Sequence, residues 1–204
     1  MTNITEDVPR DRETDGRPAV IIVSGLPRSG TSLMMQMLDA GGVAVLTDNE
    51  RVPDIDNPKG YYEFEAVKQL PGNTTWLPEA EGKAVKMVYR LLYDLPVEHS
   101  YDVIFMVRNL SEVIRSQDKM LDRLGKSKAD VPDDRLESIY RQQTDEVREW
   151  LASRPNFRTL YVRYDDVIEH APAVSRDIAR FLGLDLNVAA MEAVPDRALY
   201  RNKQ

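Results

Sequence analysis

The chain has 204 residues, of which 27 are Lys or Arg and 34 are Asp or Glu, so its formal net charge is −7. This acidic balance argues against a protein that coats nucleic acid, because that function needs an excess of Lys and Arg. The chain has no cysteine and two histidines, which excludes disulfides and a thiolate nucleophile and argues against a metal site built from Cys or His.

Residues 1–18 are mostly polar and charged, and we interpret them as a disordered N-terminal arm. They contain no apolar signal-peptide core, and no run in the chain approaches the roughly 20 apolar residues of a membrane helix. We therefore expect a cytoplasmic protein that does not bind a membrane. Residues 19–204 contain no repeat and no linker, which predicts a single domain.

The continuous β-branched run at 19–23 is typical of a central strand that is buried on both faces. A glycine-rich turn follows, and an apolar stripe then predicts a helix over 31–40. Further strands are predicted at 84–88, 103–107 and 159–162, and further helices at 62–70, 110–124, 136–151 and 174–182. This alternation predicts an α/β fold with three α/β/α layers, similar to P-loop NTPases, around a central parallel sheet of about four to five strands.

The turn between the first strand and the first helix reads Gly25-Leu26-Pro27-Arg28-Ser29-Gly30-Thr31-Ser32. Its two glycines have the spacing of a nucleotide-triphosphate loop, in which the backbone wraps an anion at a helix N-terminus. However, Thr31 stands where that loop carries its lysine, and the cation is Arg28 within the loop. No apolar strand ends in an aspartate that could hold Mg²⁺, so the pattern favours an anion other than Mg²⁺-bound ATP.

A second pattern begins at the end of the 103–107 strand. Arg108 follows this strand, and Ser116 lies eight residues further on, two turns into the next helix. Ligands of open α/β sheets gather at the carboxyl ends of strands, and a guanidinium with a hydroxyl suits a phosphate monoester. Taken alone, Arg108 fits a surface ion pair and Ser116 a solvent-facing residue equally well; together with the loop they favour a second phosphate site.

These two motifs resemble those of the sulfotransferases that use 3′-phosphoadenosine-5′-phosphosulfate (PAPS). The resemblance covers roughly 20–184 and includes a weaker match at Tyr164-Asp165-Asp166. It implies a 3′-phosphate site at Arg108 and Ser116 and places Tyr164 near the adenine, although a core tyrosine at a strand end is an equal interpretation of Tyr164. It also implies a 5′-phosphosulfate site formed by Pro27, Arg28, Ser29, Gly30, Thr31 and Ser32.

The chain departs from the cytosolic members of that family in two ways. Leu33 stands where they often carry an aromatic residue against adenine, and the C-terminal Arg-Lys-Gly segment is absent. Arg197, Arg201 and Lys203 in the tail are candidates for the missing charge. The match is closer to the bacterial and Golgi-type branches.

Sulfuryl transfer needs a cation at the bridging oxygen and a base for the acceptor. Arg28 is the first candidate cation. Lys86 is the second, because family members carry a basic residue near this strand end; a lysine facing water on an edge strand is an equal interpretation. Glu63 is the favoured base, with Glu50 and Asp48 as rivals. No metal is required.

The sequence thus predicts a sulfotransferase that moves a sulfuryl group from PAPS to a hydroxyl or amine of a small-molecule or carbohydrate acceptor. Two alternatives stay open at this point. The glycine spacing of the loop is compatible with a phosphotransferase of the nucleotide-kinase kind. The short length of the chain is compatible with a nucleotide-binding module that has no catalytic activity. The acceptor and the oligomeric state cannot be predicted from the sequence.

Overall fold

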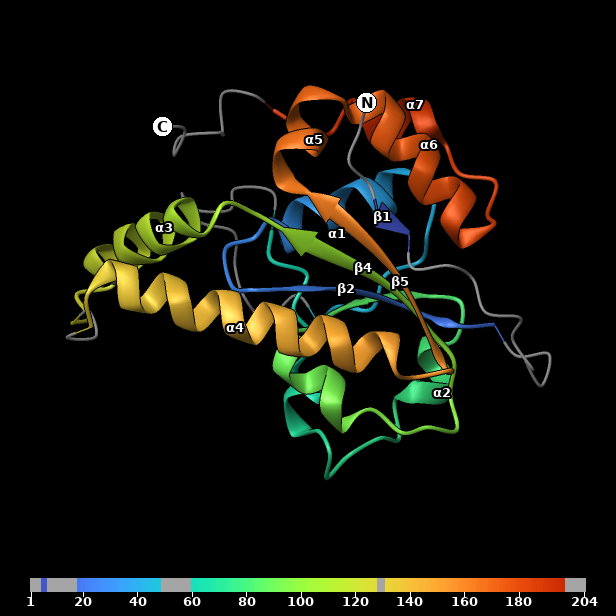
Figure 1. Ribbon diagram of the computed structural model, residues 1–204. Helices are drawn as coiled ribbons and strands as arrows, with labels where there is room; N and C mark the ends of the chain where they lie inside the picture. Colours follow the sequence, from blue (N-terminus) through green and yellow to red (C-terminus); the bar gives the residue numbers. More distant parts are fainter. Residues whose placement is uncertain (1–4, 7–17, 49–59, 128–130, 197–204) are drawn as a thin grey trace.

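The computed structural model describes residues 5–6, 18–48, 60–127 and 131–196. It contains a five-stranded sheet in the order β1-β5-β4-β2-β3 (Figure 1). Four of its strands are parallel to one another, namely β2 (Val20–Gly25), β3 (Ala84–Lys86), β4 (Tyr101–Val107) and β5 (Phe157–Arg163). The short strand β1 (Thr5–Glu6) pairs antiparallel with β5 at one edge.

The sheet is buried on both faces because its side chains alternate between two apolar clusters. Ile22 and Phe105 point into one cluster, whereas Ile21, Val23 and Met106 point into the other. This explains why the strands read as continuous apolar runs rather than as alternating ones. The prediction of a parallel sheet between helical layers is confirmed.

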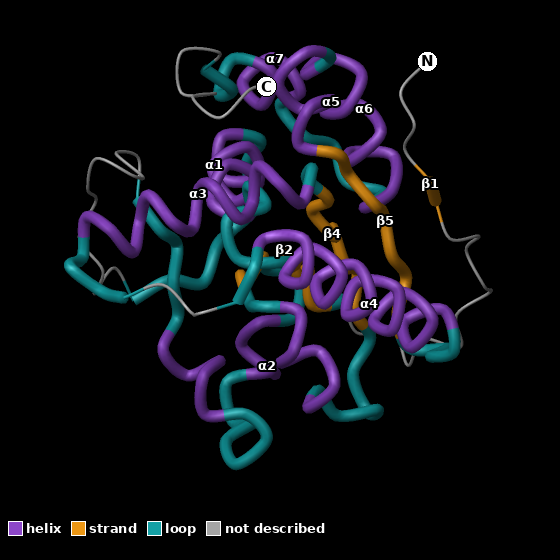
Figure 2. Tube along the Cα trace, turned by 60° about the vertical axis from the view of Figure 1, so that its left-hand side comes forward, coloured by secondary structure: helices purple, strands orange, loops and turns teal. Residues whose placement is uncertain are grey.

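Helices cover both faces of the sheet, as the two views in Figures 1 and 2 show. One layer consists of α1 (Thr31–Ala40), α5 (Tyr164–Glu169), α6 (Ala171–Leu182) and α7 (Val188–Glu192). The other consists of α4 (Asp133–Ala152), the short α2 (Leu77–Ala80) and two 3₁₀ segments, η1 (Glu65–Gln69) and η2 (Tyr89–Asp94). Helix α3 (Leu110–Arg123) follows β4 and packs against α4.

The order of the strands creates a crevice between β2 and β4. The chain leaves β2, forms β3 on one side of it, and then returns to place β4 on the other side. The connection after β2 leads to β3, whereas the connection after β4 leads to β5, so the two run in opposite directions along the sheet. The carboxyl ends of β2 and β4 therefore border a crevice, which is the usual ligand position in such sheets. Gly25 at the end of β2 is in register with Met106 near the end of β4.

Some predicted elements differ from those observed. The segment predicted as a helix at 62–70 is a 3₁₀ turn over Glu65–Gln69, since Pro71 disfavours helical geometry at Leu70. Tyr164 directly follows β5, is buried, and begins helix α5. Thr5 and Glu6 of the predicted arm form β1, and the rest of that arm before Pro18 lies outside the described residues. Within the described part of the chain, no helix is long and apolar enough to cross a membrane.

Candidate active site

The loop between β2 and α1 lies at the crevice and presents a helix N-terminus to it. No side-chain hydrogen bond caps α1 in the described structure, and its first turn contains no acidic residue. The backbone N–H groups at the start of α1 therefore remain available to an anion, with the positive end of the helix dipole behind them. The expected 5′-phosphosulfate residues, 27–32, all belong to this loop and to the first turn of the helix.

Both glycines of the loop are required by its geometry. Gly25 has a φ of 149°, and a Cβ atom at this position would lie 2.6 Å from the carbonyl oxygen of Met106 in β4. Gly30 has a φ of 103°, and its Cβ would lie 2.5 Å from the ring of Tyr164. Glycine therefore permits both the left-handed backbone and the close approach of β4 and α5.

Arg28 connects the loop to helix α3. Its Nε donates a hydrogen bond to Ser116 Oγ at 3.1 Å, and its guanidinium also reaches Met120 Sδ at 4.0 Å. Arg28 has a φ of 69°, an uncommon left-handed conformation for a residue with a side chain. The loop cation and the predicted phosphate-binding serine are thus brought together although 88 residues separate them.

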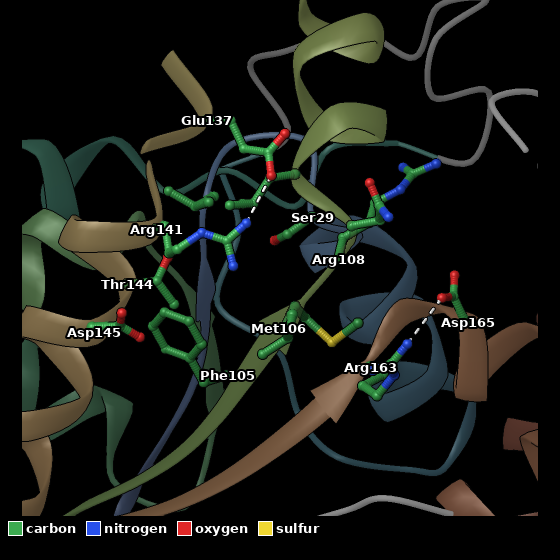
Figure 3. Close-up of a pocket in the computed structure, with 14 residues that line it drawn as sticks. Ser29, Phe105, Met106, Arg108, Glu137, Arg141, Thr144, Asp145, Arg163 and Asp165 are labelled. Atoms are coloured by element: carbon green, nitrogen blue, oxygen red, sulfur yellow. Dashed lines mark hydrogen bonds and ion pairs between the residues drawn. The ribbon is translucent and has the colours of Figure 1, made fainter. Parts of the chain in front are cut away.

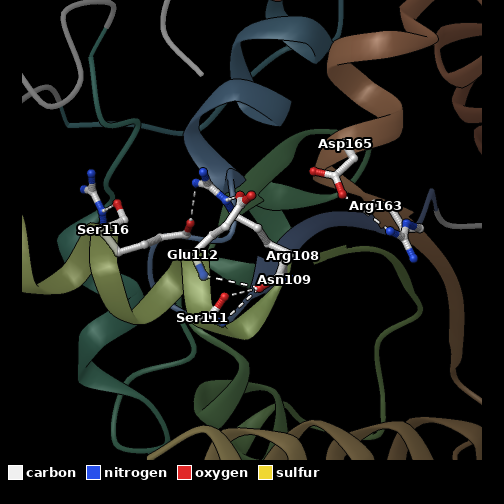
Figure 4. A network of polar contacts seen from close by, with 8 residues as sticks. Arg108, Asn109, Ser111, Glu112, Ser116, Arg163 and Asp165 are labelled. Atoms are coloured by element: carbon white, nitrogen blue, oxygen red, sulfur yellow. Dashed lines mark hydrogen bonds and ion pairs between the residues drawn. The ribbon is translucent and has the colours of Figure 1, made fainter. Parts of the chain in front are cut away.

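Arg108 is held at the same place by contacts with Arg28, Glu112 and Tyr164, and Figure 4 shows the pair with Glu112. Its Nη1 donates to the carbonyl oxygen of Arg28 at 3.2 Å, and its Nε donates to Glu112 Oε2 at 3.0 Å. Its guanidinium lies 4.2 Å from the centre of the Tyr164 ring, which adds a cation–π contact. We call Arg28, Arg108, Ser116 and Tyr164 the phosphate cluster.

The Arg108–Glu112 pair is buried, with both side chains less than a tenth exposed. Asn109 accepts from the backbone N–H groups of Ser111 and Glu112 and so begins α3 directly after Arg108. This cap fixes Glu112 one turn beyond Arg108, where the carboxylate orients the guanidinium. Sequence reasoning missed Glu112 as a site residue, although its i,i+4 spacing from Arg108 was the available signal.

Tyr164 lies within the cluster and is buried. Burial raises the pKa of its phenol above the ordinary value, while the positive charge of Arg108 acts in the opposite direction. The phenol is therefore neutral at physiological pH and provides an uncharged aromatic face beside Arg108.

Lys86 and Glu63, which we call the β3-side pair, are held by other contacts. The ammonium of Lys86, at the end of edge strand β3, donates to the carbonyl oxygen of Tyr61, so this half-buried side chain does not extend freely into water. The carboxylate of Glu63 lies 3.3 Å from Lys68 Nζ. Asp48 accepts from the backbone N–H of Glu65, and Glu50 lies outside the described residues.

A cavity of about 320 Å³ opens beside the loop, between the ends of β4 and β5 and helix α4 (Figure 3). Leu26 and Phe105 contribute apolar surface, and Ser29 and Arg108 connect the cavity to the loop and the phosphate cluster. The α4 residues that line it were not predicted as site residues, because they become neighbours of the loop only in the folded chain. Within the described structure, no group of three His, Asp or Glu side chains is arranged to hold a metal ion.

Comparison with known families identifies the family of the chain. The family model described as "Sulfotransferase domain" matches residues 18–204. The chain belongs to this family. The resemblance inferred from the loop and from the Arg108/Ser116 motif is therefore confirmed.

One solved sulfotransferase structure shares the fold with a TM-score above 0.5, and two others are similar to a lesser degree. The mouse sulfotransferase SULT7A1 complexed with PAP superposes with a TM-score of 0.51 and 18% identity, covering 88% of this chain and 63% of that chain. The sulfotransferase domain from the curacin biosynthetic pathway gives 0.49, with 16% identity and coverages of 92% and 78%. A sulfotransferase from Alicyclobacillus acidocaldarius gives 0.48, with 15% identity and coverages of 89% and 85%.

This sulfotransferase-family chain thus spans less than two thirds of the mouse protein. No curated protein sequence matches it.

Proposed function

We propose that this protein is a PAPS-dependent sulfotransferase that transfers a sulfuryl group to a hydroxyl or amine of a small-molecule acceptor. The observation that carries the proposal is the phosphate cluster. At the crevice between β2 and β4, Arg28 Nε donates to Ser116 Oγ at 3.1 Å, and Arg108 Nη1 donates to the carbonyl oxygen of Arg28. Membership of the sulfotransferase domain family and the mouse relative complexed with PAP, the product of such a donor, support the same activity.

The residues present fit a nucleotide that carries phosphates at two positions. The loop glycines let the loop lie close against β4 and Tyr164, and the hydroxyl of Ser29 is buried in this loop without a hydrogen-bond partner among the described residues. The amides of α1 suit the 5′-phosphosulfate, whereas Arg108 and Ser116 suit a 3′-phosphate. Tyr164 provides an aromatic face for the adenine. These are the residues that we expect to hold PAPS.

When bound, PAPS supplies a sulfuryl group attached to a phosphate oxygen. Arg28 binds this end of the nucleotide and stabilises the negative charge that develops on the phosphate as the sulfuryl group leaves. Lys86 is the second proposed cation, and Tyr61 holds its ammonium at the end of β3. Neither role requires a metal ion.

Glu63 is the proposed base for the acceptor proton. Its carboxylate is only about one fifth exposed and lies 3.3 Å from Lys68 Nζ. The pair also fixes the position of the carboxylate beside the segment that carries Tyr61. Asp48 is a weaker candidate, because it is used to hold the backbone of Glu65.

The proposal is tested by incubating the protein with ³⁵S-labelled PAPS and a pool of small alcohols, phenols, amines and sugars, without divalent metal. We expect a labelled sulfate ester or sulfamate that depends on both the protein and the acceptor pool. Phosphoryl transfer from Mg²⁺–ATP to the same pool, with no sulfuryl transfer, would instead indicate a phosphotransferase. Tight binding of adenosine 3′,5′-bisphosphate (PAP) with no turnover for any acceptor would indicate a binding module.

A further inference from the structure

The segment beside the β3-side pair contains a residue in an uncommon backbone conformation. Tyr62 has a φ of 52°, and among the described residues Arg28 is the other non-glycine residue with a positive φ. A left-handed backbone is unfavourable for a bulky residue and persists only where the surrounding contacts hold it. Arg28 belongs to the phosphate cluster, and Tyr62 directly precedes Glu63 in the sequence. Each of these conformations therefore occurs at or beside a proposed catalytic residue.

The φ angle of Tyr62 sets the direction of the carbonyl group that holds Lys86. This angle is the rotation about the bond from N to Cα of Tyr62, and the planar peptide unit on the N side of that bond contains the carbonyl of Tyr61. The ammonium of Lys86 donates to this carbonyl and lies 5.9 Å from the centre of the Tyr61 ring. A change of φ at Tyr62 would therefore turn the carbonyl away from the ammonium.

The side chain of Tyr62 is held by helix α1. Its hydroxyl donates to Asp39 Oδ2 at 2.9 Å, and its half-buried ring packs against the apolar cluster to which α1 contributes. Asp39 lies in the last turn of α1, the helix whose first turn belongs to the phosphate-binding loop. The carbonyl of Glu63 is fixed separately, because it accepts from Thr47 Oγ1 at 3.0 Å and from the backbone N–H of Asp48 at 3.1 Å. Tyr62 thus connects α1 to the segment that carries the proposed base.

We propose that Tyr62 is a positioning residue for sulfuryl transfer, because its hydrogen bond with Asp39 holds the left-handed backbone that directs the Tyr61 carbonyl at the Lys86 ammonium. An ammonium has three N–H donors, so one bond to a carbonyl anchors it while another contacts the nucleotide. Tyr62 acts through Tyr61 and Lys86 and not on the reacting atoms. This inference rests on the proposed function and adds the residue that positions its second cation.

The reactivity of Lys86 toward acetic anhydride tests this positioning without any nucleotide. The reagent attacks the neutral amine, whereas a hydrogen bond donated by the ammonium favours the protonated form. Brief labelling followed by mass spectrometry should show that Tyr62→Phe raises the acetylation of Lys86 by about two- to tenfold, which corresponds to the loss of one hydrogen bond. Lys83 is the internal reference, because it directly precedes β3 and pairs with Glu79. Unchanged labelling of Lys86 would overturn the proposal.

Variants of Asp39 separate the hydrogen bond from a general effect on the fold. Asp39→Ala should raise Lys86 labelling as Tyr62→Phe does, and the double variant should add nothing further, because both changes remove the same bond. Asp39→Asn keeps an acceptor oxygen and should restore most of the protection. Tyr93→Phe is the matched control, because Tyr93 is exposed and contacts Trp150 through a ring that Phe retains. Additive effects of the two single changes would contradict the proposal.

Steady-state kinetics test the consequence for transfer, with an acceptor found by the labelled-donor assay. Tyr62→Phe should lower kcat by about two- to tenfold, and Asp39→Asn should retain most of the rate. PAP affinity, measured by calorimetry, should stay within about twofold of the wild-type value, because the phosphate cluster is unchanged. A loss of PAP affinity as large as the loss of kcat would show a general disturbance of α1 and would overturn the proposal.

The two proposals fail in distinguishable ways. If Tyr62→Phe raises the labelling of Lys86, but the wild-type protein neither binds PAP nor transfers a sulfuryl group, then the positioning of Lys86 stands and the sulfotransferase proposal fails. If sulfuryl transfer occurs, but Tyr62→Phe changes neither kcat nor the labelling of Lys86, then the proposed function stands and the positioning role of Tyr62 fails.

Discussion

Strand β2 separates two groups of candidate residues that are held in different ways. The phosphate cluster joins positions far apart in the sequence: Arg28 contacts Ser116 across 88 residues, and Arg108 contacts Arg28 across 80. The β3-side pair is held by nearer neighbours, since Glu63 pairs with Lys68 five residues on and Lys86 with Tyr61 across 25.

This difference indicates how each group obtains its geometry. The order of the strands brings the cluster together, because the parallel pairing of β2 and β4 places the loop after β2 beside the residues that follow β4. Local contacts in the 60–68 segment orient the β3-side pair instead. We therefore expect the cluster to be preorganised for the nucleotide, and the β3-side pair to influence turnover more than nucleotide affinity.

The largest expected effect concerns Arg28. Arg28→Ala should lower kcat by ~10²–10³, as the loss of one positioned donor does in other enzymes. PAP affinity should fall less, because the loop amides and Arg108 remain. Steady-state kinetics and calorimetry on the same variant separate these effects. Arg28→Lys should retain part of the rate, since it keeps the charge but not the planar guanidinium.

Arg176→Ala is the matched control, because Arg176 is exposed on α6, far from the loop in the sequence. Unchanged kcat in Arg28→Ala, together with poor donor binding, would show that Arg28 only anchors the nucleotide. The catalytic cation would then have to be Lys86.

Glu63 provides the second test, on the other side of β2. Glu63→Gln should lower kcat by about 10², the lower range for loss of a general base, with little change in PAP affinity. Glu65→Gln is the control, because Glu65 also pairs with Lys68. If the two variants have equal kcat values, Glu63 is a partner of Lys68 and not the base.

Arg108 tests the cluster at the level of binding. Arg108→Ala should weaken PAP binding about tenfold or more, because it removes a charge-assisted hydrogen bond. It also breaks the buried ion pair between Arg108 and Glu112, which should cost about 3–5 kcal/mol of folding stability. The double variant Arg108→Ala/Glu112→Gln should recover stability, measured by urea unfolding, but not affinity. Recovery of affinity would show that Arg108 acts only through the fold.

The smallest expected effect concerns Tyr62, whose hydroxyl donates to Asp39 at 2.9 Å. Burial, followed by this hydrogen bond, raises the pKa of Tyr62 to about 12. The folded state therefore retains a proton that the unfolded chain loses near pH 10. This contribution to stability is complete below pH 10 and disappears as the pH rises from 10 to 12.

Tyr62→Phe should thus make the decrease in urea midpoint between pH 10 and 12 less steep. The same decrease in the variant and the wild type would show that Tyr62 contributes nothing to it.

The strands could be predicted, and the two motifs proposed to bind phosphate could be recognised, because each is contiguous or closely spaced in the sequence. The run at 20–23 is apolar at every position, and Arg108 and Ser116 lie on one helix-linked segment. Conversely, the spacing of Glu112 from Arg108 could be read from the sequence, but the burial of this ion pair depends on the folded chain. The stacking of Arg108 on Tyr164 depends on β4 and β5 being neighbours, which the sequence does not specify.

The α4 wall of the cavity illustrates the same limit. In the sequence, Arg141, Thr144 and Asp145 are indistinguishable from any polar face of a long amphipathic helix. They line a cavity beside the loop only because α4 and the end of β4 are neighbours in the folded chain. The catalytic role of Lys86 is proposed from the family resemblance and that of Glu63 from its place after a turn, whereas the contacts that hold both side chains could not be predicted.

The most direct test of the account is the affinity for a nucleotide with and without a 3′-phosphate. PAP and AMP share the adenosine and the 5′-phosphate, so the difference between them measures the site formed by Arg108 and Ser116. Calorimetric titration without Mg²⁺ should show PAP binding at least about tenfold more tightly than AMP, with the difference reduced in Ser116→Ala. Equal affinity for PAP and AMP would contradict the account.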